Sequence, residues 1–125
     1  MPSDGAAQPA LLQGTLDLLI LATLARGPAH GYAIARTIER TSGGLLAVEE
    51  GSLYPALKRL RRTGEIDAEW QTTGTGRRGK VYRLVADGRE RLARERNLWS
   101  DYVAAVSRVL AGHAPGPFDL ESIAD

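Results

Sequence analysis

Three glycines and three cations crowd into one short segment of the chain. Gly74, Gly76 and Gly79 match GxGxxG, the pattern of dinucleotide-binding loops, and the segment also comes close to the GxxxxGK phosphate loop. Both loops need a strand before them and a helix directly after them, so that the helix N-terminus meets the phosphate. Here the β-branched and aromatic run "VYRLV" follows, and Val81 replaces the Ser or Thr of a phosphate loop. The segment therefore predicts a hairpin tip, residues 74–80, rather than a nucleotide-binding loop.

Basic residues are concentrated in the middle of the chain. The 125 residues carry a net charge of +1, but residues 52–83 hold eight Lys and Arg against three Asp and Glu. The segments on either side are both net acidic. Such a local basic block indicates an anionic partner, although a solvated surface would look the same by charge alone.

The residue types give little support to other chemistries. The chain has no cysteine, which excludes disulfides, thiolate zinc sites and thiol nucleophiles. Neither His30 nor His113 has a carboxylate at metal-ligand spacing. Ser52 has no recognisable base, and no pair of acids is placed for general acid–base catalysis. We therefore expect no enzyme activity, no cofactor and no metal.

Helical periodicity predicts three helices before the hairpin. The first begins near Gly14 and ends at the "RGP" of residues 26–28, and its leucines cover more than one face, which indicates burial against both the core and a partner subunit. A second lies within residues 30–44. The third contains "GSLYPALKRLRR" and begins at Ser52 or slightly earlier, at Glu49 or Glu50, with a leucine stripe facing inward and cations elsewhere.

After the third helix, the spacing of apolar residues changes from the helical period of 3.6 residues to the strand period of 2. Ile66, Ala68 and Trp70 alternate with polar residues before the glycines, and Tyr82 and Leu84 alternate after them, which predicts a β-hairpin. A long helix is predicted over residues 86–111. Its apolar positions follow a heptad seam with 7, 4, 3, 4 spacing, formed by Leu92, Trp99, Val103, Val106 and Leu110.

This order of elements predicts a mainly α fold with a small β-hairpin, a winged helix-turn-helix followed by a long C-terminal dimerisation helix. In that arrangement the third helix enters the major groove of DNA, and the hairpin, or wing, lies along the backbone or in the minor groove. The expected divisions are a flexible arm at residues 1–11, the DNA-binding domain at 12–85, the dimerisation helix at 86–111 and a tail at 112–125.

The segments "GTLDLLILATLARGPAHGYAI", "GSLYPALKRLRRTGEI" and "RRGKVYRL" with its following "DG" resemble the PadR family of bacterial transcriptional regulators. The resemblance covers residues 12–110, and the single last helix is similar to that of the short subfamily. It implies a cytoplasmic winged-helix homodimer, usually a repressor, often released from DNA by phenolic or drug-like aromatic molecules. Two positions depart from the family pattern, Glu49 at the start of the third helix and Val85 where Thr usually caps the last helix.

The cations and aromatic residues of this fold give the candidate DNA contacts. On the third helix, Ser52, Tyr54 and Lys58 would face the groove, although Tyr54 could instead pack in the core. The arginines of this helix would contact phosphate or only solvent. Tyr32, as the resemblance suggests, would touch a phosphate through its hydroxyl. The predicted contacts are Ser52, Tyr54, Lys58, Arg59, Arg61, Arg62, Tyr32, Arg77, Arg78 and Lys80.

The predicted dimer interface combines the last helix with the first. Trp99 either packs in this interface or, with Tyr102, lines a pocket for a flat aromatic effector. The predicted interface residues are Leu16, Leu19, Leu92, Trp99, Val103, Val106 and Leu110.

The function that these features favour is a homodimeric repressor that binds a pseudo-palindromic operator and is released by a small aromatic effector. The longest apolar run, residues 16–25, is too short to span a bilayer, and the N-terminus lacks a basic signal region. We therefore expect a cytoplasmic, nucleoid-associated protein with no membrane partner. The alternative is a winged-helix module that binds an acidic protein surface, which would have the same sequence features.

Overall fold

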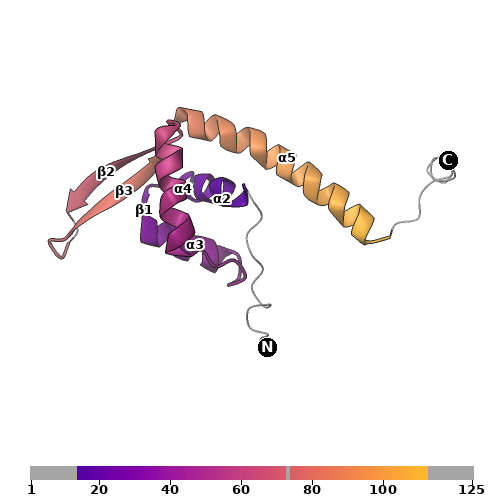
Figure 1. Ribbon diagram of the computed structural model, residues 1–125, viewed down its shortest axis with the longest axis horizontal. Coiled ribbons are helices and arrows are strands. Elements are labelled where there is room, and N and C mark those ends of the chain that lie inside the picture. The colour runs from indigo at the N-terminus through magenta and orange to yellow at the C-terminus, as the bar shows by residue number, and fades with distance from the viewer. Residues whose placement is uncertain (1–13, 73, 113–125) are drawn as a thin grey trace. The chain divides into compact units, whose positions relative to one another are not determined.

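The computed structural model describes residues 14–72 and 74–112. These residues form two compact units, the first ending at Arg94 and the second beginning at Glu95. The order of elements matches the predicted winged helix-turn-helix, and the fold class is confirmed as mainly helical with a small antiparallel sheet (Figure 1). The elements are α2 (Thr15–Leu24), β1 (Ala29–His30), α3 (Gly31–Thr41), α4 (Glu50–Arg62), β2 (Ile66–Thr72), β3 (Arg78–Leu84) and α5 (Ala86–Leu110).

The core of the first unit joins α2, α3, α4 and the base of the sheet. Apolar residues recur at helical spacing on the inner faces of these helices, and their burial removes them from water. On α4 the predicted leucine stripe faces inward, since Leu53, Leu57 and Leu60 are each 1% exposed. The helix begins at Glu50, the earlier of the two predicted starts. The other core residues are Ile20, Leu21, Leu24, Ile34, Ile38, Ala56, Ile66, Tyr82, Leu84 and Leu92.

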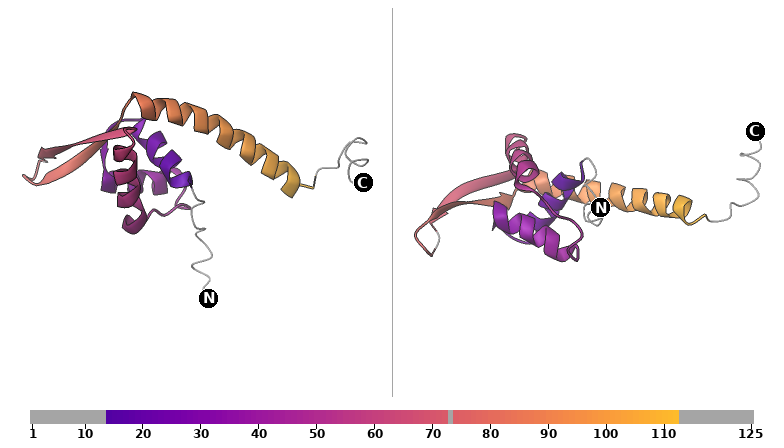
Figure 2. Two further views of the ribbon diagram at one scale, coloured as in Figure 1. Left: turned by 45° about the horizontal axis from the view of Figure 1, so that its top comes forward. Right: turned by 60° about the horizontal axis from the view of Figure 1, so that its bottom comes forward.

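The sheet has three strands in the order β1–β3–β2, all antiparallel. Strand β1 is absent from the sequence prediction, because two residues are too few to show a period. The hairpin β2–β3 extends beyond the helices of the first unit (Figure 2). Its strands reach to Thr72 and from Arg78, so the tip is shorter than the predicted 74–80. Gly76, with φ 85°, supplies the left-handed residue of the turn.

The first turns of α5 belong to the first unit and pack on its core. Gly88 is buried over the backbone of Glu65, so closely that an added Cβ would lie 2.2 Å from the Glu65 carbonyl oxygen. Leu92, one turn later, is 7% exposed within a single chain. The heptad spacing predicts Leu92 on the dimer seam; within a single chain it already packs on the core of its own first unit, and its place on the seam stays a prediction.

The second unit contains the remainder of α5, from residue 95 onward. Its apolar side chains are exposed, among them Trp99 and Val106 at 38% and 37%. Within the two described ranges, no helix is long and apolar enough to cross a membrane.

Candidate nucleic-acid interface

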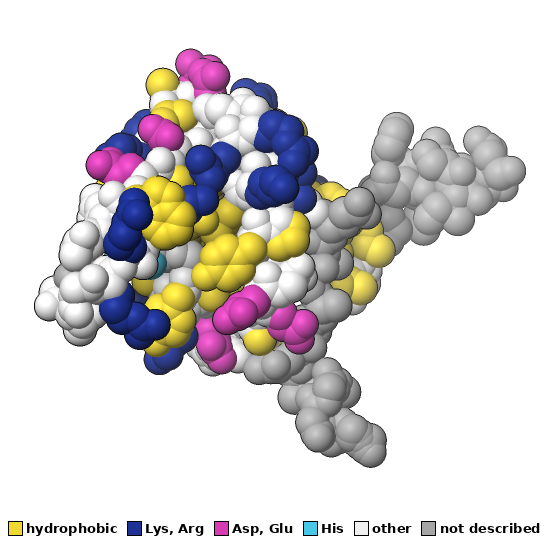
Figure 3. Space-filling model, turned by 60° about the vertical axis from the view of Figure 1, so that its left-hand side comes forward, with side chains coloured by type: hydrophobic (Ala, Val, Ile, Leu, Met, Phe, Trp, Pro, Cys, Tyr) yellow, Lys and Arg dark blue, Asp and Glu magenta, His cyan; other side chains and the backbone are white. Residues whose placement is uncertain are grey.

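One face of the first unit gathers aromatic and cationic side chains from α3, α4 and the wing, defined here as β2, β3 and the tip between them. Figure 3 shows this face, with hydrophobic side chains set among Lys and Arg. At its centre is a hollow of about 380 Å³, which we call the aromatic pocket. It is lined by His30, Gly31, Tyr32, Tyr54, Trp70, Gly79, Lys80 and Tyr82, with no acidic residue among them.

The two faces of the wing differ in charge. The strand register pairs Trp70 with Lys80 and Thr72 with Arg78, which places these four side chains on one face. The Arg78 guanidinium carbon lies 5.1 Å from the centre of the Trp70 ring, and the Lys80 ammonium lies 5.3 Å from it. On the other face, Arg83 is neutralised by Glu69 at 2.7 Å. The wing therefore presents Arg78 and Lys80 together with the Trp70 indole on one face, and an ion pair on the other.

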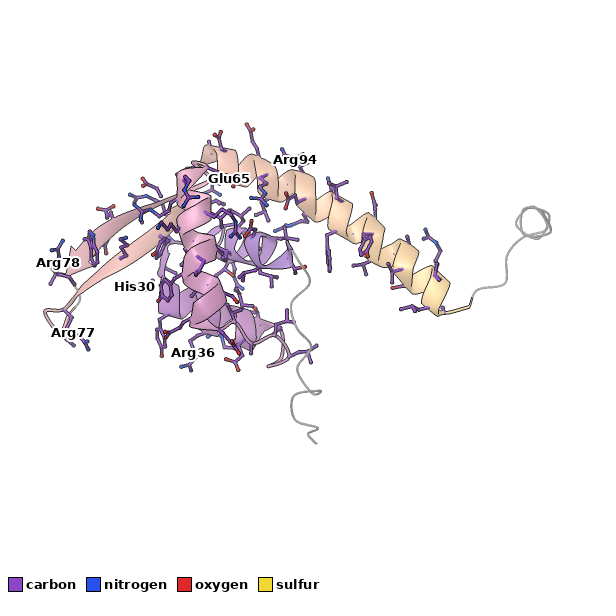
Figure 4. The ribbon with its side chains drawn as sticks, viewed as in Figure 1. His30, Arg36, Glu65, Arg77, Arg78 and Arg94 are labelled. Atoms are coloured by element: carbon purple, nitrogen blue, oxygen red, sulfur yellow. The ribbon has the colours of Figure 1, made fainter. Side chains whose placement is uncertain are left out.

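His30, which directly precedes α3, contacts the middle of strand β3. Its Nδ1 lies 3.0 Å from the carbonyl oxygen of Lys80, and because a carbonyl only accepts, Nδ1 carries the proton. The imidazole packs on Gly79, where a Cβ would approach it to 3.1 Å. Figure 4 shows His30 on the side of the helices, with Arg77 and Arg78 at the outer end of the hairpin. The wing and α3 are thus held in a fixed relation.

The start of α3 adds a further cation to this face. Arg36 donates a hydrogen bond to the Tyr32 hydroxyl at 3.0 Å and lies over the Tyr32 ring at 5.6 Å from its centre. Tyr32 itself is 66% exposed. The predicted phosphate contact at Tyr32 is therefore accessible, and Arg36 stands beside it as a cation that the sequence prediction did not include.

On α4 the predicted groove-facing residues are exposed. Tyr54 is 43% exposed and lines the aromatic pocket, so the alternative that it packs in the core does not describe its position. Exposed side chains on the same helix are those of Ser52, Lys58, Arg59, Arg61 and Arg62.

Arg59 has an intramolecular partner that its predicted role did not include. It donates to the buried carboxylate of Asp17 at 2.6 Å, and Arg91 reaches the other oxygen of that carboxylate at 3.3 Å. Arg91 also pairs with Glu65 at 2.8 Å. This network ties α2, α4 and α5 together, and it holds the Arg59 guanidinium toward α2.

We expect Asp17→Asn to destabilise the protein by about 1–2 kcal/mol in chemical denaturation, because it removes the charge that Arg59 and Arg91 share. The expected loss of unfolding free energy is modest because the Arg59 side chain is 52% exposed, so that solvent partly screens its ion pair with Asp17. Glu69→Gln is the matched control. It breaks an ion pair whose side chains are about half exposed, and should change stability by less than about 1 kcal/mol. Equal losses in the two variants would refute the structural role of Asp17.

Burial raises the pKa of Tyr82 above 10.0, the nearby Tyr54 raises it further, and Arg61 opposes the shift. Well below pH 10, the Tyr82 phenol is neutral in both the folded and the unfolded chain. As the pH rises above about 10, the unfolded chain loses this proton first, so stability should fall through the raised pKa. Unfolding free energies at about pH 9 and about pH 11 should therefore differ more in the native protein than in Tyr82→Phe. An identical pH dependence in the variant would contradict this assignment.

The residues predicted for the dimer and effector site fall in two places. Leu16 and Leu19 on α2 are partly buried against the core of the first unit. Trp99 and Tyr102 lie in the second unit with their ring centres 6.1 Å apart. Of the two histidines, His113 lies outside the described residues. Among the side chains that are described, no three His, Asp or Glu come together as metal ligands.

Sequence reasoning missed Trp70 and His30 as parts of this face. Trp70 was assigned only to a strand, although counting outward from the glycine loop would have paired it with Lys80. His30 was considered only as a metal ligand, and its place beside the wing depends on β1, which the sequence pattern does not reveal.

Comparison with known proteins agrees with this geometry. Residues 20–94, more than half of the chain, match the model of the transcriptional regulator PadR-like family. A PadR family transcription regulator from Clostridium difficile is 27% identical, with a TM-score of 0.69 over 78% of this chain and 99% of that one. A PadR family transcriptional regulator from Eggerthella lenta is 31% identical, with a TM-score of 0.67 over 78% and 83%.

A curated relative is an uncharacterized 37.1 kDa protein in transposon TN4556 of Streptomyces fradiae, 42% identical over 79 residues. The match covers 63% of this chain but only 21% of that protein, so most of the relative has no counterpart here. The residues that match the family model include α3, α4, the wing and every residue that lines the aromatic pocket. The chain belongs to the PadR-like family of transcriptional regulators, DNA-binding proteins with a winged-helix fold.

Proposed function

We propose that the chain is a homodimeric repressor that binds a pseudo-palindromic operator through α4 and the wing and is released by a small aromatic effector. The observation that supports the DNA-binding part is the face on which Tyr32 and Tyr54 lie beside the wing cation Lys80, with further Lys and Arg side chains around them (Figure 3). Cations at the ends of long side chains neutralise phosphates and release counterions, which supplies much of the affinity. Base edges in the groove would be read by Ser52, Tyr54 and Lys58.

The exposed stripe on α5 supports a dimer. Trp99, Val103, Val106 and Leu110 follow 4, 3, 4 spacing and are all exposed in a single chain. Such a stripe is the seam by which two helices pack against each other. A two-fold dimer would present its α4 helices to half-sites about 34 Å apart, one turn of DNA.

The effector is proposed to act on this dimer. Trp99 and Tyr102 offer exposed aromatic surface next to the seam, and flat molecules stack on such rings. A ligand bound there would favour a separation of the α4 helices that no longer fits the operator.

The experiment that tests this function is a mobility-shift titration on the DNA upstream of the protein's own gene. We expect binding that survives an excess of unlabelled unrelated genomic DNA but weakens steeply as salt rises. Absence of binding at low salt would favour the alternative, a module that binds an acidic protein surface. Sedimentation equilibrium of the same sample should give the mass of a dimer.

The effector part has its own test. Aromatic compounds that release the DNA should also quench the fluorescence of Trp99, measured in a Trp70→Phe background so that Trp99 is the only tryptophan. Release of the DNA without any change in Trp99 emission would place the effector elsewhere.

A further inference from the structure

Trp70 is a large apolar side chain that the fold leaves unburied. On its face of the hairpin, Ile66, Leu84 and Tyr82 are 3–6% exposed, but Trp70 is 56% exposed. Trp70 does not stand alone, because Tyr32 and Tyr54 line the same pocket, and a contiguous exposed apolar patch of this kind marks a surface that binds a partner. The fold alone does not account for tryptophan at this position.

The indole organises the two wing cations beside it. Arg78 and Lys80 both lie within cation–π distance of the Trp70 ring. A guanidinium stacked on a ring keeps its N–H groups available for an anion. Restricting these long side chains before binding also lowers the entropy that a complex would lose. Trp70 therefore acts on the cations as well as presenting its own surface.

The aromatic pocket beside Trp70 has a mixed character. Tyr32, Tyr54 and Trp70 supply aromatic walls, Lys80 supplies a positive charge, and no acidic side chain lines it. Its occupant should therefore combine an apolar surface with a negative charge. A deoxyribose with its phosphate has both, and aromatic side chains and lysine are suited to its two parts.

We propose that the aromatic pocket seats one sugar–phosphate unit of the DNA backbone, with the Trp70 indole against the deoxyribose and Lys80 on the phosphate. The inference rests on the proposed DNA-binding function and adds the place where the backbone enters the protein. It also makes Trp70 a DNA-contacting residue that positions Arg78. Because the sugar and phosphate carry no base identity, this contact contributes equally to all sequences.

The first test compares three variants by fluorescence anisotropy on a labelled 30-bp duplex at low salt, with circular dichroism to confirm folding. Trp70→Leu keeps an apolar side chain but removes the ring, and should weaken binding about tenfold. Trp70→Phe should stay within about threefold of the native protein, because a smaller ring still packs on sugar. The matched control is Gln71→Ala, the neighbouring exposed residue on the other face of β2, and should not change the affinity. Native affinity in Trp70→Leu would overturn the proposal.

The second test does not depend on how well Trp70→Leu folds. In a Trp99→Phe background Trp70 is the only tryptophan, and its quenching by acrylamide should fall by at least about half when the duplex is saturating. Unchanged quenching on DNA that is demonstrably bound would overturn the proposal while leaving DNA binding intact. Saturable quenching by sodium benzoate, with no protection by DNA, would also overturn it and assign the pocket to aromatic acids. No binding of the native protein to any duplex would instead refute the proposed function.

Discussion

A triple variant, Arg77→Ala with Arg78→Ala and Lys80→Ala, is expected to bind duplex DNA about 100- to 1000-fold more weakly than the native protein at moderate salt. A hydrogen bond to a charged group contributes about 1.5 kcal/mol or more, which is roughly tenfold in affinity. The three cations lie on the wing, and two of them share its one cationic face with Trp70. Arg83, a further cation of β3, cannot replace them, since it is on the other face of the wing and paired with Glu69.

The salt dependence of binding separates this effect from a general loss of positive charge. Each phosphate contact removed makes the slope of log K against log salt shallower by about 0.9, so the triple variant should lose nearly three units. Arg83→Ala with Arg89→Ala and Arg94→Ala removes the same charge from exposed positions outside the wing's cationic face and is the matched control. If both triple variants show the same loss of affinity and the same reduction in the slope of log K against log salt, then net charge rather than the wing governs binding.

Gly88→Ala has the largest expected effect on stability. In an ordinary helix this change stabilises by about 1 kcal/mol, because alanine has the higher helix propensity. Here the new Cβ would lie 2.2 Å from the Glu65 carbonyl oxygen and 2.6 Å from Leu84 Cδ1. Glu65 cannot easily move, since its backbone N–H bonds Leu60 and its side chain bonds Arg91.

We therefore expect Gly88→Ala to lose about 3–5 kcal/mol, a large part of the stability of a domain of this size. The melting temperature should fall by roughly 10–20 °C. Gly51→Ala on α4 is the control, because a Cβ there meets nothing within 4 Å and should stabilise by about 0.5–1 kcal/mol. Equal melting temperatures in the two variants would show that α5 does not pack on Glu65 as described.

The sequence was sufficient for those parts of the fold that repeat a pattern over several residues. The helices and the hairpin were predictable because apolar residues repeat at one spacing over most of each element. The leucine stripe of α4 faces the core, as this spacing predicted. Strand β1 was not predictable, since Ala29 and His30 become a strand only by pairing with β3. The same long-range dependence hid the ion pair between Asp17 and Arg59, which are 42 residues apart in the chain.

The candidate site was predictable in its residue types more than in its arrangement. Exposed cations on α4 and the wing follow from helical and strand periods, but their partners do not. The heptad spacing likewise does not reveal that Leu92 also packs on the core of its own chain. The role of Trp70 also depends on its place beside Tyr32 and Tyr54, which lie on other elements and which the hairpin pattern does not reveal.

The most direct test of the central claim, that this face of the folded chain lies against DNA, is cleavage of DNA by a probe on the wing tip. The chain has no cysteine, so Gly74→Cys gives a single attachment point for an iron chelate that cuts nearby DNA. Gly74 is exposed with no atom near its Cβ position, so the change should be tolerated. We predict cuts confined to two short regions related by the symmetry of the operator, and none from Glu90→Cys on α5. Bound DNA that the Gly74 probe leaves uncut would contradict the account.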